Sequence, residues 1–159
     1  MKANIISLAV VALLVVATAE ASVFEIRRIE PKASKKSKSF TINNGGRVET
    51  LNLNNEPLLD RSALIGARAT EETVAVTSGP KPEQKSVPAI KLTFTGDGLA
   101  RFTEVTTTLV GKQVGVVIDG KLVATPAVRE TMRRNSITLT GNFTKEEATD
   151  LVAKINAGK

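Results

Sequence analysis

The chain of 159 residues contains no cysteine, no histidine, no tryptophan and no tyrosine. Without cysteine it forms no disulfide and offers no thiolate, and without histidine it lacks the commonest general base and metal ligand. Carboxylates or a serine–lysine pair remain as possible catalytic groups, but no such constellation stands out in the sequence. We therefore predict that the protein is not an enzyme, with no catalytic residues, no metal site and no cofactor.

Aromatic residues make up only 3% of the chain, so the core has to be built from aliphatic side chains and five phenylalanines. Charge is more plentiful: 22 Lys and Arg against 16 Asp and Glu give a formal net charge of +6. Residues 22–46 carry several of the lysines, in a run without apolar periodicity. We predict that this segment is a basic, solvated arm, with a short edge strand at most over 23–29.

A basic arm is compatible with nucleic acid, anionic lipid or an acidic protein as the partner. Aromatic residues are not interleaved with the lysines, and no base-reading motif is present, so we expect no nucleic-acid partner. Attachment to the cell envelope through this arm is the alternative function that the composition leaves open.

The N-terminus has the pattern of a secretory signal peptide. Lys2 precedes an almost uninterrupted apolar run over 5–17, and Ala19-Glu20-Ala21 fits the small-x-small cleavage pattern. We predict a signal peptide over 1–21, cleavage between Ala21 and Ser22, and a mature protein in the periplasm or secreted. The alternative is an uncleaved segment that anchors the chain in the inner membrane, although a span needs about 20 apolar residues.

Residues 47–158 have the patterns of one folded domain. Alternating apolar residues predict strands over 47–53 and 67–77, with one helical turn over 60–64 between them. A third strand over 89–94 leads into a helix with Thr95 or Asp97 as N-cap, which Gly111 terminates.

The next elements are defined by turn and capping residues. Asp119-Gly120 favours a type I′ turn between two strands, because that turn needs positive φ at both central positions. Thr125-Pro126 is typical of a helix start, with Val128 and Met132 on one face. A last strand is predicted over 136–140.

A final helix begins at a capping box formed by Thr144 and Glu147, and its buried stripe includes Ala148 and Ile155. The order over 89–140 is then β-α-β-β-α-β, the ferredoxin-like arrangement, followed by the C-terminal helix. We predict an α+β fold with a small antiparallel or mixed sheet and helices on one face.

Several of these motifs, in this order, resemble the head subdomain of the large periplasmic domain of SecD, a subunit of the bacterial protein-export machinery. The resemblance covers about 56–158, and its most specific parts are 102–106, Gly111-Lys112, 116–120 with Pro126, and 141–144 with 146–148. One departure is Arg134-Asn135-Ser136, where the family usually carries glycine; asparagine tolerates the positive φ of such a turn.

The resemblance implies an exported, stand-alone, non-catalytic module that binds secreted or envelope polypeptides. SecD uses transmembrane segments for proton-coupled work, whereas this sequence has one apolar run and no intramembrane carboxylate, so we expect passive binding. A free sheet face or edge strand is the expected contact surface. As partner-binding residues we name the apolar side chains of the predicted hairpin, Val114, Val116, Ile118 and Leu122.

Overall fold

The computed structural model describes residues 23–76 and 83–158, which form two antiparallel sheets and two α-helices. The predicted signal peptide, including Ala21 and Ser22, lies outside the described residues. The larger sheet has the order β2-β3-β1-β6-β7. Its strands are β1 (Phe24–Glu30), β2 (Ser37–Asn44), β3 (Arg47–Asp60), β6 (Val114–Ile118) and β7 (Lys121–Ala124).

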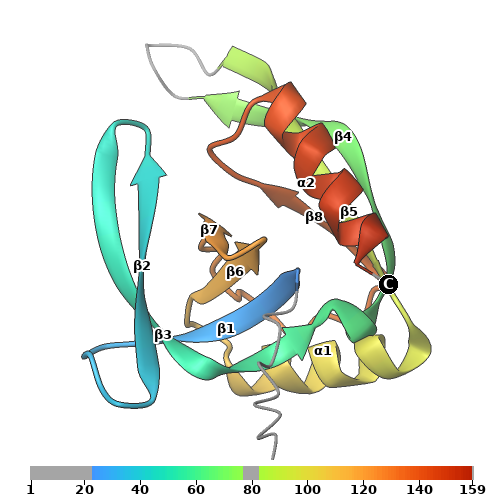
Figure 1. The fold of residues 1–159 in the computed structure, drawn as a ribbon. Coiled ribbons are helices and arrows are strands. Elements are labelled where there is room, and N and C mark those ends of the chain that lie inside the picture. The colour runs from blue at the N-terminus through green and yellow to red at the C-terminus, as the bar shows by residue number, and fades with distance from the viewer. Residues whose placement is uncertain (1–22, 77–82, 159) are drawn as a thin grey trace, which may run out of the picture.

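The smaller sheet has the order β4-β5-β8. Its strands are β4 (Leu64–Val76), β5 (Glu83–Phe94) and β8 (Ser136–Thr140). The short 3-10 helix η1 (Arg61–Ala63) links the two sheets and confirms the helical turn predicted over 60–64. Helix α1 (Gly96–Thr108) lies below both sheets in Figure 1, and α2 (Lys145–Ala157) packs along β4 and β5.

The core lies between the two sheets and the helices. Strand β6 is at its centre, since all five residues of Val-Gly-Val-Val-Ile are buried. Its side chains alternate between two apolar clusters. One cluster fills the space between the sheets and includes Phe24, Ile90 and Phe102. The smaller one joins Val117 to Ile42, Leu53 and Leu122.

The three local signals with the most specific chemistry are confirmed. Thr95 caps α1, with its hydroxyl accepting from the Gly98 amide at 2.9 Å. Asp119 and Gly120 have φ of 50° and 73°, as a type I′ turn requires. Thr144 and Glu147 form the predicted capping box.

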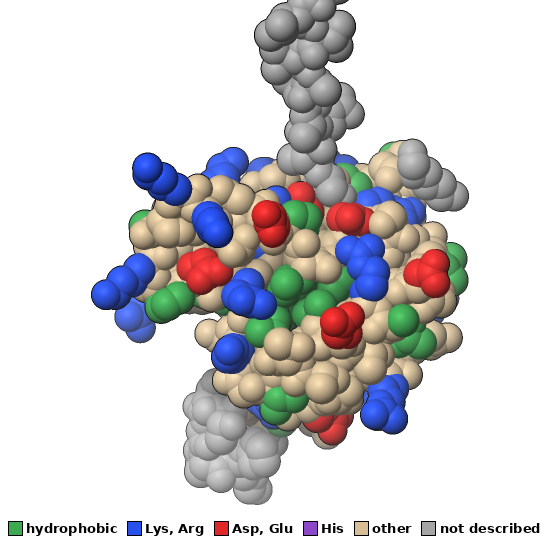
Figure 2. Space-filling model, turned by 90° about the horizontal axis from the view of Figure 1, so that it is seen from below, with side chains coloured by type: hydrophobic (Ala, Val, Ile, Leu, Met, Phe, Trp, Pro, Cys, Tyr) green, Lys and Arg blue, Asp and Glu red, His purple; other side chains and the backbone are tan. Residues whose placement is uncertain are grey.

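The described part of the predicted arm, residues 23–46, belongs to the folded domain, which corrects the predicted domain boundary. Strand β1 is a central strand paired with both β3 and β6, and Phe24 and Ile26 are buried. The basic run misled the prediction because its lysines lie in the β1–β2 connection and at an outward position of β2. Figure 2 shows Lys and Arg side chains that project at the left, the side on which the β2–β3 hairpin lies in Figure 1.

No helix forms after Thr125-Pro126, which corrects a second prediction. The segment runs extended alongside Gly111–Val114 instead: Val128 donates to the Lys112 carbonyl at 2.8 Å and accepts from Gly111 at 2.8 Å. Proline fits an extended backbone as well as a helix start, and Val128 and Met132 are too short a stripe to hold a helix.

The α+β class is confirmed, but the ferredoxin-like arrangement is not formed. That arrangement places all its strands in one sheet. Here β5 and β8 pair in the smaller sheet, whereas the β6–β7 hairpin belongs to the larger one.

Candidate functional site

The four residues predicted to bind a partner are core residues. Val114, Val116, Ile118 and Leu122 are 5%, 1%, 0% and 6% exposed. The prediction that they form an accessible surface is therefore wrong, because β6 is covered on both faces. Leu122 alone borders a surface feature.

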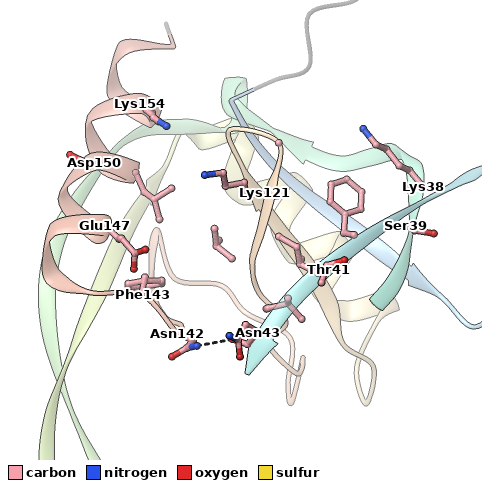
Figure 3. Close-up of a pocket in the computed structure, with 16 residues that line it drawn as sticks. Lys38, Ser39, Thr41, Asn43, Lys121, Asn142, Phe143, Glu147, Asp150 and Lys154 are labelled. Carbon is pink, nitrogen blue, oxygen red and sulfur yellow. Dashed lines mark hydrogen bonds between the residues drawn. The ribbon is translucent and has the colours of Figure 1, made fainter. Parts of the chain in front are cut away.

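That feature is a groove of about 690 Å³ between β2, the β6–β7 turn with β7, and α2. Figure 3 shows β2 along one wall and α2 along the other, with Lys121 between them. Strands β2 and β7 are the two edges of the larger sheet, so the sheet curves until its own edges border one groove. A volume of this size is within the range that binding sites in proteins have.

The floor of the groove is apolar. Ile42 and Leu122 belong to the smaller core cluster and are each 6% exposed, so they form a packed base. Phe40, Phe143 and Leu151 are half-buried along the sides. A partner that covers these three side chains removes apolar surface from water, which is the main driving force for association.

Charged side chains form the rim. Lys154 on α2 donates to the Asp119 carboxylate at 2.5 Å and ties the helix to the β6–β7 turn. This hydrogen bond lowers the pKa of Asp119 and raises the pKa of Lys154. On the opposite wall, the Lys38 ammonium lies 5.6 Å from the centre of the Phe40 ring, in reach of a cation–π contact.

One end of the groove is closed by a hydrogen bond between segments far apart in the sequence. The Asn142 side-chain amide, just before α2, donates to the backbone carbonyl of Asn43 in β2 at 2.7 Å (Figure 3). The contact joins the tip region of the β2–β3 hairpin to the loop between β8 and α2.

One carboxylate of the groove has a structural role. Glu147 faces the groove but is engaged as a cap, accepting from the Thr144 amide at 2.7 Å. Within 23–76 and 83–158 no group of three or more Asp or Glu residues is arranged to hold a metal ion. In the same residues no helix has the length and apolar content that crossing a membrane requires. The arrangement suits recognition by shape, apolar contact and backbone hydrogen bonds.

Most of the chain matches a known protein family. The family model described as SecDF, P1 head subdomain, matches residues 48–159. The chain belongs to this family. The resemblance noted in the sequence is thereby confirmed, and it connects the chain with protein translocation.

Curated relatives are full translocase subunits. The chain is 33% identical over 101 residues to protein translocase subunit SecD of Syntrophobacter fumaroxidans. It is 29% identical over 102 residues to protein translocase subunit SecDF of Thermus thermophilus. Both matches cover 64% of this chain, which spans 18% of the first relative and 12% of the second.

Two solved SecDF structures share the fold. The super-membrane-facing form of SecDF aligns with a TM-score of 0.59 and 22% identity, over 87% of this chain and 19% of that chain. A structure of SecDF described as a membrane component that enhances protein export aligns with a TM-score of 0.57 and 21% identity, over 87% of this chain and 63% of that chain. The 87% of this chain that aligns is more than residues 48–159 alone contain, so the shared fold includes part of the segment before residue 48.

The sequence did not reveal the groove because its lining comes from three separate segments. The sequence pointed to Gly120 and Leu122 in the predicted hairpin and to the family motif 141–144 with its capping partner Glu147, but not to the groove that they line together. Asn142 and Phe143 lie in that motif, and both line the groove. The side chains of β2 were missed because the segment was interpreted as a mobile arm.

Proposed function

We propose that this member of the SecDF P1 head family is an exported, non-catalytic module that binds extended polypeptide segments during protein export. The observation that supports it most directly is the groove between β2, β7 and α2, which combines an apolar floor with a charged rim and the free backbone edge of β2. Unfolded chains expose apolar side chains and unpaired backbone groups, and the groove offers a counterpart to both. Export of the chain rests on the signal-peptide pattern over 1–21, with membrane anchoring as the alternative.

The experiment measures binding of reduced, carboxymethylated α-lactalbumin, a permanently unfolded probe, by fluorescence anisotropy. Leu151→Ser is expected to weaken binding about tenfold, because it removes apolar contact from the side of the groove. Val152→Ser is the matched control: Val152 is half-buried on the same helix but does not line the groove. It is expected to leave the affinity unchanged.

Thermal unfolding of both variants, followed by circular dichroism, separates lost binding from lost folding. Absence of binding by the wild-type chain would refute the proposed function. Equal losses in the two variants, at equal stability, would place the binding surface elsewhere.

A second candidate function is electrostatic attachment to an anionic envelope surface. Lys32, Lys35 and Lys36 are all exposed in the β1–β2 connection, and none takes part in the ion pairs found among the described residues. Replacing the three by glutamine is expected to weaken partitioning onto phosphatidylglycerol vesicles at low salt, measured by co-sedimentation, by about a hundredfold, given about 1 kcal/mol for each lysine near such a surface.

The matched control replaces Lys85, Lys91 and Lys112 by glutamine, which removes the same charge from other elements. If both triple variants lose retention equally, net charge and not this connection governs attachment.

A further inference from the structure

We propose that the groove takes an extended polypeptide as an added strand, hydrogen-bonded to the free edge of β2. The inference rests on the proposed function and specifies how the same site binds. The partner is defined by its chemistry: a segment in strand conformation, free of proline, with an apolar residue at every second position.

The register of the β2–β3 hairpin determines which backbone groups of β2 are free. Asn44 and Arg47 close the hairpin around Gly45 and Gly46, whose φ of 62° and 93° suit a two-residue type I′ turn. The pair that closes such a turn is hydrogen-bonded, and hydrogen-bonded pairs then alternate with pairs that are not. The Asn55 amide donates to the Lys36 carbonyl at 2.8 Å, which agrees with bonding at even-numbered positions of β2.

The odd-numbered positions Ser39, Thr41 and Asn43 therefore direct their amides and carbonyls away from β3. No strand of the larger sheet is hydrogen-bonded to β2 on this side, and β7 lies near it across the groove. All three residues line the groove. The free edge of β2 thus faces the groove. A bound segment in strand conformation would form hydrogen bonds with these amides and carbonyls in place of water.

Asn142 already makes one of the bonds that an added strand would make. Its side-chain amide donates to the Asn43 carbonyl at 2.7 Å, in the direction in which the neighbouring strand of a sheet donates. This bond occupies the last free carbonyl at that end. The added strand is therefore limited to Ser39 and Thr41 and the positions before them, and Asn142 sets where it stops.

Side-chain alternation accounts for the apolar part of the preference. Phe40 and Ile42 point to the side of β2 opposite to Ser39 and Thr41, toward the cluster that includes Leu122. Successive side chains of a strand point to opposite faces. Every second side chain of an added strand therefore lies beside Phe40 and Ile42, over the floor of the groove.

A single flexible strand fits this site better than the edge of a second folded copy does. Helix α2 forms the opposite wall of the groove, with Glu147, Asp150 and Leu151 among the lining residues. A second folded sheet would bring its own next strand against that wall. An unfolded segment has no such neighbour.

The test compares Thr41→Pro with Thr50→Pro. Thr41 and Thr50 are opposite each other in the hairpin, and both are exposed. They form a non-hydrogen-bonded pair, so proline at either position removes an amide that the hairpin does not use. The Thr41 amide points into the groove, whereas the Thr50 amide points to the other side of the hairpin.

Two separate probes are used. The first is carboxymethylated α-lactalbumin, and the second is an eight-residue peptide that alternates valine and threonine between terminal glutamates. We expect Thr41→Pro to weaken binding of both about tenfold and Thr50→Pro to change it less than twofold. Equal affinity of Thr41→Pro and the wild type would overturn strand addition while leaving the proposed function intact. Loss of all binding by the wild type would instead refute the proposed function.

A second measurement uses the wild-type chain, so it does not depend on how the proline variants fold. The peptide is N-methylated either on its valines or on its threonines. Since alternate amides of an added strand face β2, one methylated form is expected to lose binding and the other to retain it. Retention of binding by both methylated forms overturns the proposal. A wild-type chain that binds no peptide but forms a dimer that Thr41→Pro abolishes overturns it as well.

Discussion

Arg27→Met is expected to lower the free energy of unfolding by about 3–5 kcal/mol, because it leaves a buried carboxylate without its partner. Arg27 Nε lies 2.6 Å from Glu25 Oε2, and the two side chains are only 13% and 7% exposed. The same guanidinium donates to the Asn54 carbonyl at 2.6 Å and to the Asn55 carbonyl. It therefore holds β1 to β3 where the register between them shifts.

Urea unfolding followed by circular dichroism measures the loss. Arg101→Met is the control, since its contact with Asp60 is 4.0 Å long and both side chains are more than a third exposed. That variant is expected to lose less than about 1 kcal/mol. The double variant Glu25→Leu, Arg27→Met is expected to regain much of the loss, because it removes both charges together. A loss no larger than that of Arg101→Met would show that the pair is not effectively buried.

Gly98→Ala is expected to destabilise the protein by about 3 kcal/mol, at the upper end of the range for overpacked sites. A Cβ atom at this position would lie 2.0 Å from the Ala63 carbonyl oxygen and 2.7 Å from its carbon. Both atoms are backbone, so no rotamer change relieves the contact. Ala63 also accepts from the Thr95 amide at 3.0 Å, so displacing it disturbs the start of α1.

Gly96→Ala is the matched control on the same helix. No heavy atom lies within 4 Å of a Cβ built there. Because alanine restricts the unfolded chain and favours helix, this change is expected to be neutral or to stabilise by up to about 1 kcal/mol. Unfolding midpoints in urea distinguish the two variants, and similar values for both would show that η1 and α1 separate easily.

The local elements that the sequence predicted correctly are those whose chemistry is contained in a few adjacent residues. Thr95, Asp119-Gly120 and the Thr144–Glu147 pair each satisfy a backbone requirement within four residues of themselves. The pairing of strands is different. Phe24 pairs with Ile118, and nothing near either residue specifies that partner.

The two errors of interpretation have the same origin. The lysines around β2 resemble a solvated arm when only composition is considered, and their outward positions become apparent only once β3 is in place. Similarly, Pro126 has the same fixed φ in a helix and in an extended segment, so the Val114 amide, which donates to the Pro126 carbonyl, decides between them. The groove depends on both outcomes, since its wall is β2 and its floor is held by the β6–β7 hairpin.

The position of β1 also determines the order in which this domain can assemble. The β2–β3 hairpin closes around a two-residue turn and can form as soon as its residues are available. Strand β1 is different, because one of its neighbours, β6, ends at Ile118, more than ninety positions along the chain. A chain synthesised from its N-terminus therefore keeps one side of β1 unpaired until β6 has followed, so the larger sheet is completed late.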